Sequence, residues 1–174
     1  MKHNSPLAQR GFTLVEALVS IVVLTLGMMG IGKLVMTALK SNDSAYMRSQ
    51  ATALAYAILD DMRANRQIAM SQGYDVAMTD AYSDPSATCL SATCNAQDLA
   101  TYDVALWKQK LGADSATPGQ LPGGNGSIVT VTGTNNQTTA TITVQWNDAL
   151  AQAVYSPSAS TTSSPMSITL VTVL

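Results

Sequence analysis

Histidine, glutamate and cysteine, which often carry chemistry, are scarce in this chain of 174 residues. Histidine occurs once, as His3, which leaves no catalytic histidine in the body of the chain for a serine or cysteine nucleophile. No glycine-rich loop is followed by the lysine and helix that cradle a phosphate, and no basic cluster indicates nucleic acid. We therefore expect a protein that is not an enzyme and that uses no metal or cofactor.

Glutamate is as scarce as histidine, and its position is informative. Glu16 is the only glutamate, and it lies inside the apolar run Phe12–Ile31. A helix of about 20 residues spans about 30 Å, the hydrocarbon thickness of a bilayer. A carboxylate there costs a few kcal/mol unless it finds a partner or reaches the interface. The chain thus carries one costly acid near the start of a predicted membrane span.

The flanks of this run predict its orientation. Lys2 and Arg10 precede it, whereas the remainder of the chain has more acidic than basic side chains. Basic residues before a span are retained in the cytoplasm, so the residues after the run are expected to be exported. No small-residue cleavage site follows the run, which distinguishes it from a secretory signal.

The stretch Arg10–Glu16, with the sequence Arg-Gly-Phe-Thr-Leu-Val-Glu, resembles the leader junction of type IV prepilins. The resemblance implies cleavage after Gly11 by prepilin peptidase, methylation of the new N-terminus at Phe12, and a role for Glu16 in pairing subunits during assembly. An uncleaved signal anchor is the alternative. It would share the span and its orientation but would need neither Gly11 nor Glu16.

Helical patterning continues to about Gln67. No proline interrupts the chain between Phe12 and Asp84, and apolar residues recur every three or four positions on one face. The stripe comprises Met47, Ala51, Leu54, Ile58 and Met62. The expected organisation is a leader at 1–11, a transmembrane helical half at 12–31, an amphipathic half at 32–67 and an exported head at 68–174.

The head is predicted to contain a loop at 68–96, a short helix and three strands. The helix runs from about Asp98 to Leu111, where Gly112 would stop it. The strands are expected at 127–132, 139–146 and 166–174, and a hairpin turn at 133–137 joins the first two. Alternation in the second strand gives it one buried face. We expect an α+β, pilin-like fold in which the long helix covers a small antiparallel sheet.

The two cysteines, Cys89 and Cys94, both fall on the predicted exported side. An oxidising compartment favours a disulfide between them, with free or metal-bound thiols as the alternatives. Because the loop is small, the bond should add only about 2 kcal/mol of stability.

Further segments resemble minor pilins of the PilV type. They are Asp61–Asn65, the order Asp103, Trp107 and Leu111, the turn Leu121–Gly126, and Val144–Asp148. The resemblance implies a minor pilin that helps to start assembly and enters the type IV pilus, or fimbrium. Implied partners are other minor and major pilins, prepilin peptidase, the inner membrane and the assembly platform. The implied location is the inner membrane with a periplasmic head, then the fibre at the cell surface. Alternatives are a minor pseudopilin of type II secretion and a membrane-anchored periplasmic binding module.

Cleavage after Gly11 is directly testable. Replacing Gly11 with a bulky residue should leave an unprocessed precursor, whereas the wild-type chain should begin at methylated Phe12. Mass spectrometry of the N-terminal peptide distinguishes the two products. Normal processing of the variant would remove the peptidase assignment.

Overall fold

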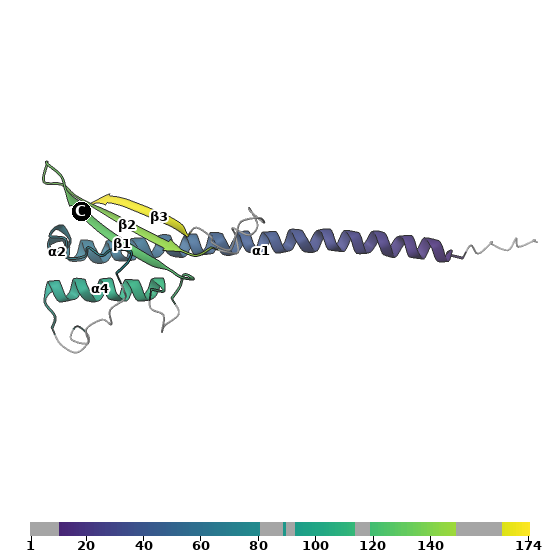
Figure 1. The fold of residues 1–174 in the computed structure, drawn as a ribbon, viewed down its shortest axis with the longest axis horizontal. Helices are drawn as coiled ribbons and strands as arrows, with labels where there is room; N and C mark the ends of the chain where they lie inside the picture. The colour runs from purple at the N-terminus through teal and green to yellow at the C-terminus, as the bar shows by residue number, and fades with distance from the viewer. Residues whose placement is uncertain (1–10, 81–88, 90–92, 114–118, 149–164) are drawn as a thin grey trace, which may run out of the picture. The chain divides into compact units, whose positions relative to one another are not determined.

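The computed structural model describes residues 11–80, 89, 93–113, 119–148 and 165–174 (Figure 1). Its elements are α1 (Leu14–Ala64), α2 (Arg66–Met70), α4 (Ala96–Leu111), β1 (Asn125–Thr132), β2 (Thr138–Trp146) and β3 (Met166–Val173). The chain divides into two compact units, one ending at Leu39 and the other running from Lys40 to Leu174. Each is described by itself below.

The first unit consists of the N-terminal part of α1. Every described side chain up to Leu39 is exposed within the unit. The helix runs through Gly27, Gly30 and Gly32 without interruption, and a Cβ added at any of the three would meet nothing within 4 Å. These glycines therefore leave shallow places on the helix surface and do not end it.

The second unit has a core between α1, α4 and the sheet. The predicted stripe on α1 is buried from Ala51 to Met62, and Met47 is partly buried against the same core. On the sheet, Ala140, Ile142, Val144 and Trp146 are fully or almost fully buried, as the alternation in this strand predicts. The α+β arrangement of a long helix on a small antiparallel sheet is confirmed.

The sheet has the order β1-β2-β3, and both pairings are antiparallel. Ile128 pairs with Ile142, which pairs in turn with Leu170, so one row of apolar side chains crosses the sheet on its inner face. Gly133 N–H donates to the carbonyl oxygen of Gln137 at 2.8 Å and closes the predicted hairpin turn. The strand bounds differ from the predicted ones by two residues at most.

The long helix ends earlier than predicted. α1 stops at Ala64, and α2 follows after Asn65, whose φ of −114° and ψ of 47° are not helical. The Asn65 side-chain amide donates to the carbonyl oxygen of Ala96 at 2.7 Å, a contact across 31 residues. The prediction of one helix to about Gln67 is therefore wrong at its end. The break coincides with a long-range hydrogen bond, which the spacing of residues along the chain does not reveal.

The head helix α4 has both of its terminal signals. Asn95 is the N-cap and accepts a hydrogen bond from the Asp98 N–H at 2.8 Å, and Gly112 ends the helix with a left-handed φ of 112°. The helix begins at Ala96, two residues before the predicted start. Trp107 Nε1 donates to the carbonyl oxygen of Leu54 at 3.0 Å, which fixes α4 to α1.

Close approach of β1 to α4 makes Gly126 sensitive to substitution. A Cβ at Gly126 would lie 2.3 Å from a ring carbon of Trp107 and 2.8 Å from a methyl carbon of Leu111, both buried. Gly126→Ala should lower the free energy of unfolding by about 2 kcal/mol, because overpacking a tight core forces side chains and backbone to shift. Denaturation followed by tryptophan fluorescence measures the change.

Gly133→Ala is the matched control for this change. Its nearest new contact would be at 3.6 Å, with the carbonyl oxygen of Gln137, so the free energy of unfolding should change by less than about 1 kcal/mol. Equal effects of the two substitutions would contradict the tight approach of β1 to α4.

Candidate functional site

The N-terminal site residues of the sequence analysis lie at the start of α1. Gly11 and Phe12 precede the helix, and Phe12 is 85% exposed. Glu16 is the acidic residue of the first helical turn. The structure therefore places the predicted cleavage position outside regular structure and the carboxylate one turn away from it.

Thr13 caps this helix, a role that the sequence analysis missed. The Glu16 N–H lies 3.4 Å from Thr13 Oγ1 and 3.1 Å from the Thr13 carbonyl oxygen. Thr-x-x-Glu is the sequence pattern of a capping box, so the signal was present in Thr13–Glu16. A negative side chain in the first turn also interacts favourably with the helix dipole. The Glu16 N–H thus takes part in the helix cap, which is independent of the pairing role predicted for the carboxylate.

The surface of α1 after Glu16 is apolar and suited to a medium without water. The helix contains an 18-residue window with a mean hydropathy of 2.3, and none of that window is buried inside the structure. Its hydroxyl groups are bonded within the helix: Ser20 Oγ donates to the Glu16 carbonyl oxygen at 2.7 Å, and Thr25 Oγ1 to that of Val22 at 2.8 Å. Such bonds remove the cost of bringing the hydroxyls into lipid or a helix bundle.

The two cysteines form the predicted disulfide, Cys89–Cys94, with their Cα atoms 5.0 Å apart. In the described part of the chain, no three side chains among histidine, cysteine, aspartate and glutamate are grouped to hold a metal ion. The bond closes a loop of the head next to α4, whose N-cap is Asn95.

A tyrosine–carboxylate pair lies between α1 and α4. Tyr74 is buried, and its hydroxyl donates to Asp103 Oδ2 at 2.8 Å. Burial raises the pKa of Asp103, the Tyr74 hydrogen bond opposes this, and the charge of Asp61 adds to it. Burial and the bond to Asp103 also raise the pKa of Tyr74. The pair therefore anchors the segment after α2 to α4.

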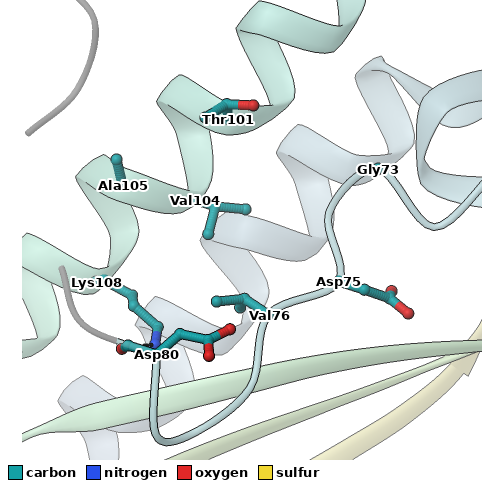
Figure 2. Close-up of a pocket in the computed structure, with 8 residues that line it drawn as sticks. All are labelled: Gly73, Asp75, Val76, Asp80, Thr101, Val104, Ala105 and Lys108. Carbon is teal, nitrogen blue, oxygen red and sulfur yellow. Dashed lines mark hydrogen bonds between the residues drawn. The ribbon is translucent and has the colours of Figure 1, made fainter. Parts of the chain in front are cut away.

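Lys108 lines a cavity of about 240 Å³ between α4 and residues 73–80 (Figure 2). Its side chain is buried, and Nζ donates to the carbonyl oxygens of Ala77 at 2.9 Å and Asp80 at 2.6 Å. Burial lowers the pKa of Lys108, while the nearby charge of Asp80 opposes that change. Lys108 therefore holds the turn at 77–80 against α4.

The two acids that line this cavity, Asp75 and Asp80, also have hydrogen-bond partners within the protein. Asp80 Oδ2 accepts the Ala77 N–H at 2.8 Å, and Asp75 Oδ1 accepts both the N–H and the hydroxyl of Thr130. Their hydrogen bonds secure the segment 75–80 to its own turn and to β1. The arrangement fits a scaffold and gives no array of groups converging on a ligand.

Two protein-family models match this chain, and both cover parts of α1. Residues 33–105 match the family described as type IV pilin Tt1218, and residues 7–32 match the prokaryotic N-terminal methylation motif. Together the two matches support a type IV pilin that carries a prepilin N-methylation motif. Such a family suggests a structural protein that interacts with other pilins after processing by prepilin peptidase. No curated protein and no solved structure matches the chain.

The raised pKa of Asp103 predicts a pH-dependent stability. Between the pKa of an unfolded aspartate, about 3.9, and the higher folded value, the folded state binds more protons, so the free energy of unfolding falls as pH rises. Asp103→Asn should remove this contribution. Its stability relative to the wild type should therefore increase as pH rises through that window, as measured by denaturation at several pH values.

Tyr74→Phe provides the complementary variant. It removes the hydrogen bond that favours the ionised carboxylate, so the window should extend to higher pH than in the wild type. Parallel stability curves for the wild type and Asp103→Asn at pH values above the unfolded aspartate pKa of about 3.9 would contradict the assignment.

Proposed function

We propose that the protein is a minor pilin subunit of a type IV pilus, of the PilV type, that helps to start pilus assembly and is incorporated into the fibre. The observation that carries the proposal is the first part of α1, whose apolar surface is long enough to cross a membrane and has no residue over that length buried within the structure. Lipid covers such a surface before assembly, and the helices of other pilins cover it afterwards.

Processing precedes assembly in this proposal. Prepilin peptidase removes residues 1–11 by cutting after Gly11, and Phe12 is then methylated. The exposure of Phe12 and the non-helical conformation of residues 11–13 support access to this bond. The processed protein stays in the inner membrane through residues 12–31, while the amphipathic half at 32–67 and the head at 68–174 lie in the periplasm.

Glu16 then pairs with the positive N-terminal amine of a neighbouring subunit at Phe12. Methylation retains the charge of that amine. Four residues of helical rise separate the two positions by about 6 Å along an axis, so axially staggered neighbours bring the two groups together. An unpaired carboxylate surrounded by apolar side chains is costly, and the pairing therefore also sets the register of the helices.

The finer assignment is supported by the segments that resemble PilV-type pilins. Several of these segments make contacts that stabilise the head. Asn65 bonds to the carbonyl oxygen of Ala96, and Trp107 bonds to that of Leu54. In the turn Leu121–Gly126, the Gly124 N–H donates to the Leu121 carbonyl oxygen at 3.1 Å, and Gly126 lies against Trp107. These contacts give the head a defined surface to present to other minor pilins.

The proposal predicts that Glu16 acts at assembly. Glu16→Ala should be cleaved, inserted and folded as the wild type is, yet its ratio in sheared pili to that in membranes should fall several-fold, by about tenfold if pairing contributes 1.4 kcal/mol. Glu16→Asp should be intermediate, because it keeps the charge and shortens the reach. Quantitative mass spectrometry of both fractions gives the ratio.

Ser20→Ala is the matched control, because Ser20 lies one turn further along the same exposed helix and its hydroxyl bonds only within that helix. It should leave the ratio unchanged. An unchanged ratio for Glu16→Ala would defeat the pairing mechanism. Absence of the wild-type protein from sheared pili would defeat the proposed function itself.

A further inference from the structure

The two edges of the sheet differ in the hydrogen bonds that they make with the rest of the described chain. At the β1 edge, Ile128 forms a bridge with Val76, with N–H to oxygen bonds of 2.9 and 3.0 Å. The next outward N–H, that of Thr130, donates to Asp75 Oδ1 at 3.0 Å, and the Thr130 carbonyl oxygen accepts from Gln72 Nε2 at 3.3 Å. The segment after α2 thus provides hydrogen-bond partners for the backbone of this edge, from both its main chain and its side chains.

The other edge, along β3, has no such cover in the described ranges. Leu174 N–H donates to the Thr138 carbonyl oxygen at 2.9 Å, so the even-numbered residues of β3 bond to β2. The backbone groups that point away from β2 belong to Ser167, Thr169, Val171 and Val173. Among the residues that the structure describes, their only contact at this edge is a 3.5 Å approach of Thr172 Oγ1 to the Val173 carbonyl oxygen.

β3 also lacks the features that normally protect an edge strand. Met166–Val173 contains no charged residue and no proline, and its register with β2 is continuous over eight residue pairs. On the exposed face, Val129, Thr141 and Val171 form one row across the sheet, and Val131, Thr139 and Val173 form the next. The four valines are 48–61% exposed.

We propose that the β3 edge receives an extended, uncharged segment of another protein, which adds a fourth strand to the sheet. A row of backbone donors and acceptors is matched by another extended backbone. A charged segment would lose hydration against this edge without gaining an ion pair, because β3 offers no charge. β-Branched side chains on the added strand would continue the rows of threonine and valine.

A second copy of this chain is disfavoured as the occupant by the direction of β3. Ser44 Oγ donates to Asp148 Oδ2 beyond the end of β2, whereas Arg66 Nη2 donates to the carbonyl oxygen of Leu174 at 2.9 Å. Because Trp146 at the end of β2 pairs with Met166, β3 runs in the same direction as the part of α1 from Lys40 onward.

Antiparallel pairing of two β3 strands would therefore reverse the part of α1 from Lys40 onward in the second copy. Copies that share one membrane or one fibre have their helices in the same direction, a point that rests on the proposed function. An extended segment from a different protein is not restricted in this way. It can run antiparallel to β3, the direction that gives the more stable pairing per residue.

Amide hydrogen exchange of the full chain in detergent micelles tests the proposal. In the free protein, the amides of Thr169 and Val171 should exchange faster than those of Ile128 and Thr130, whose edge is bonded. The probe is a synthetic peptide of alternating threonine and valine with lysines outside the strand for solubility. Its addition should slow exchange at Ser167, Thr169, Val171 and Val173 by about tenfold or more.

Variants separate edge pairing from docking on the exposed face. Val171→Pro removes an outward amide and no bond to β2, so peptide affinity should fall by about tenfold or more while the unfolding transition is retained. Val171→Lys places a charge on the open edge strand and should act in the same direction. Val129→Lys, in the same row but on the covered strand, should change affinity by less than about twofold.

Four outcomes overturn the inference. Slow exchange at Thr169 and Val171 in the free monomer would show that the chain covers its own edge. Protection that rises with protein concentration and accompanies a doubling of mass would identify a second copy. No slowing by the peptide, or equal loss of affinity for the two lysine variants, would leave no strand site at this edge. None of these outcomes depends on pilus incorporation, so failure here is distinguishable from failure of the proposed function.

Discussion

Burial of one stripe of α1 against the inner face of the sheet holds the second unit together. Ala51, Ile58 and Met62 of α1 are fully buried in one core together with Ile142 and Val144 of β2. Full burial of a valine, isoleucine or methionine side chain contributes about 1.5–3 kcal/mol. Because β2 is central in the sheet, this contact also positions β1 and β3. The α4 helix is then fixed to the same part of α1 through the Trp107 bond to Leu54.

The N-terminal part of the same helix meets the opposite requirement. Its side chains are exposed within the structure although they are apolar, and its hydroxyls are satisfied internally. The stability of the head therefore does not depend on what covers this apolar surface. In the function that we propose, Glu16 is the residue that couples this surface to assembly, because an acid in apolar surroundings is stabilised most by a nearby cation.

Polar groups after α2 secure the compact arrangement of the second unit. Asp75 and Gln72 complete the β1 edge, Tyr74 bonds to Asp103, and Lys108 holds the turn at 77–80. The bonds of Asp75 and Gln72 with Thr130 act at the β1 side of the sheet. The β3 strand, which closes the other side, depends on its pairing with β2 and its inner apolar residues, which leaves its outer backbone as the surface for interaction.

Local patterns in the sequence determined the membrane-length helix, the stripe on its second part, the alternation of β2 and the glycine that ends α4, because spacing along the chain sets which side chains share a face. The Thr13–Glu16 capping pattern was readable in the same way but was overlooked. Only the tertiary structure decided that α1 ends at Ala64, that Lys108 bonds to the carbonyl oxygens of Ala77 and Asp80, and that, among the described residues, β1 is covered while β3 is open. Each depends on contacts between residues far apart in the chain, whose proximity is produced by packing and leaves no periodic signal in the sequence.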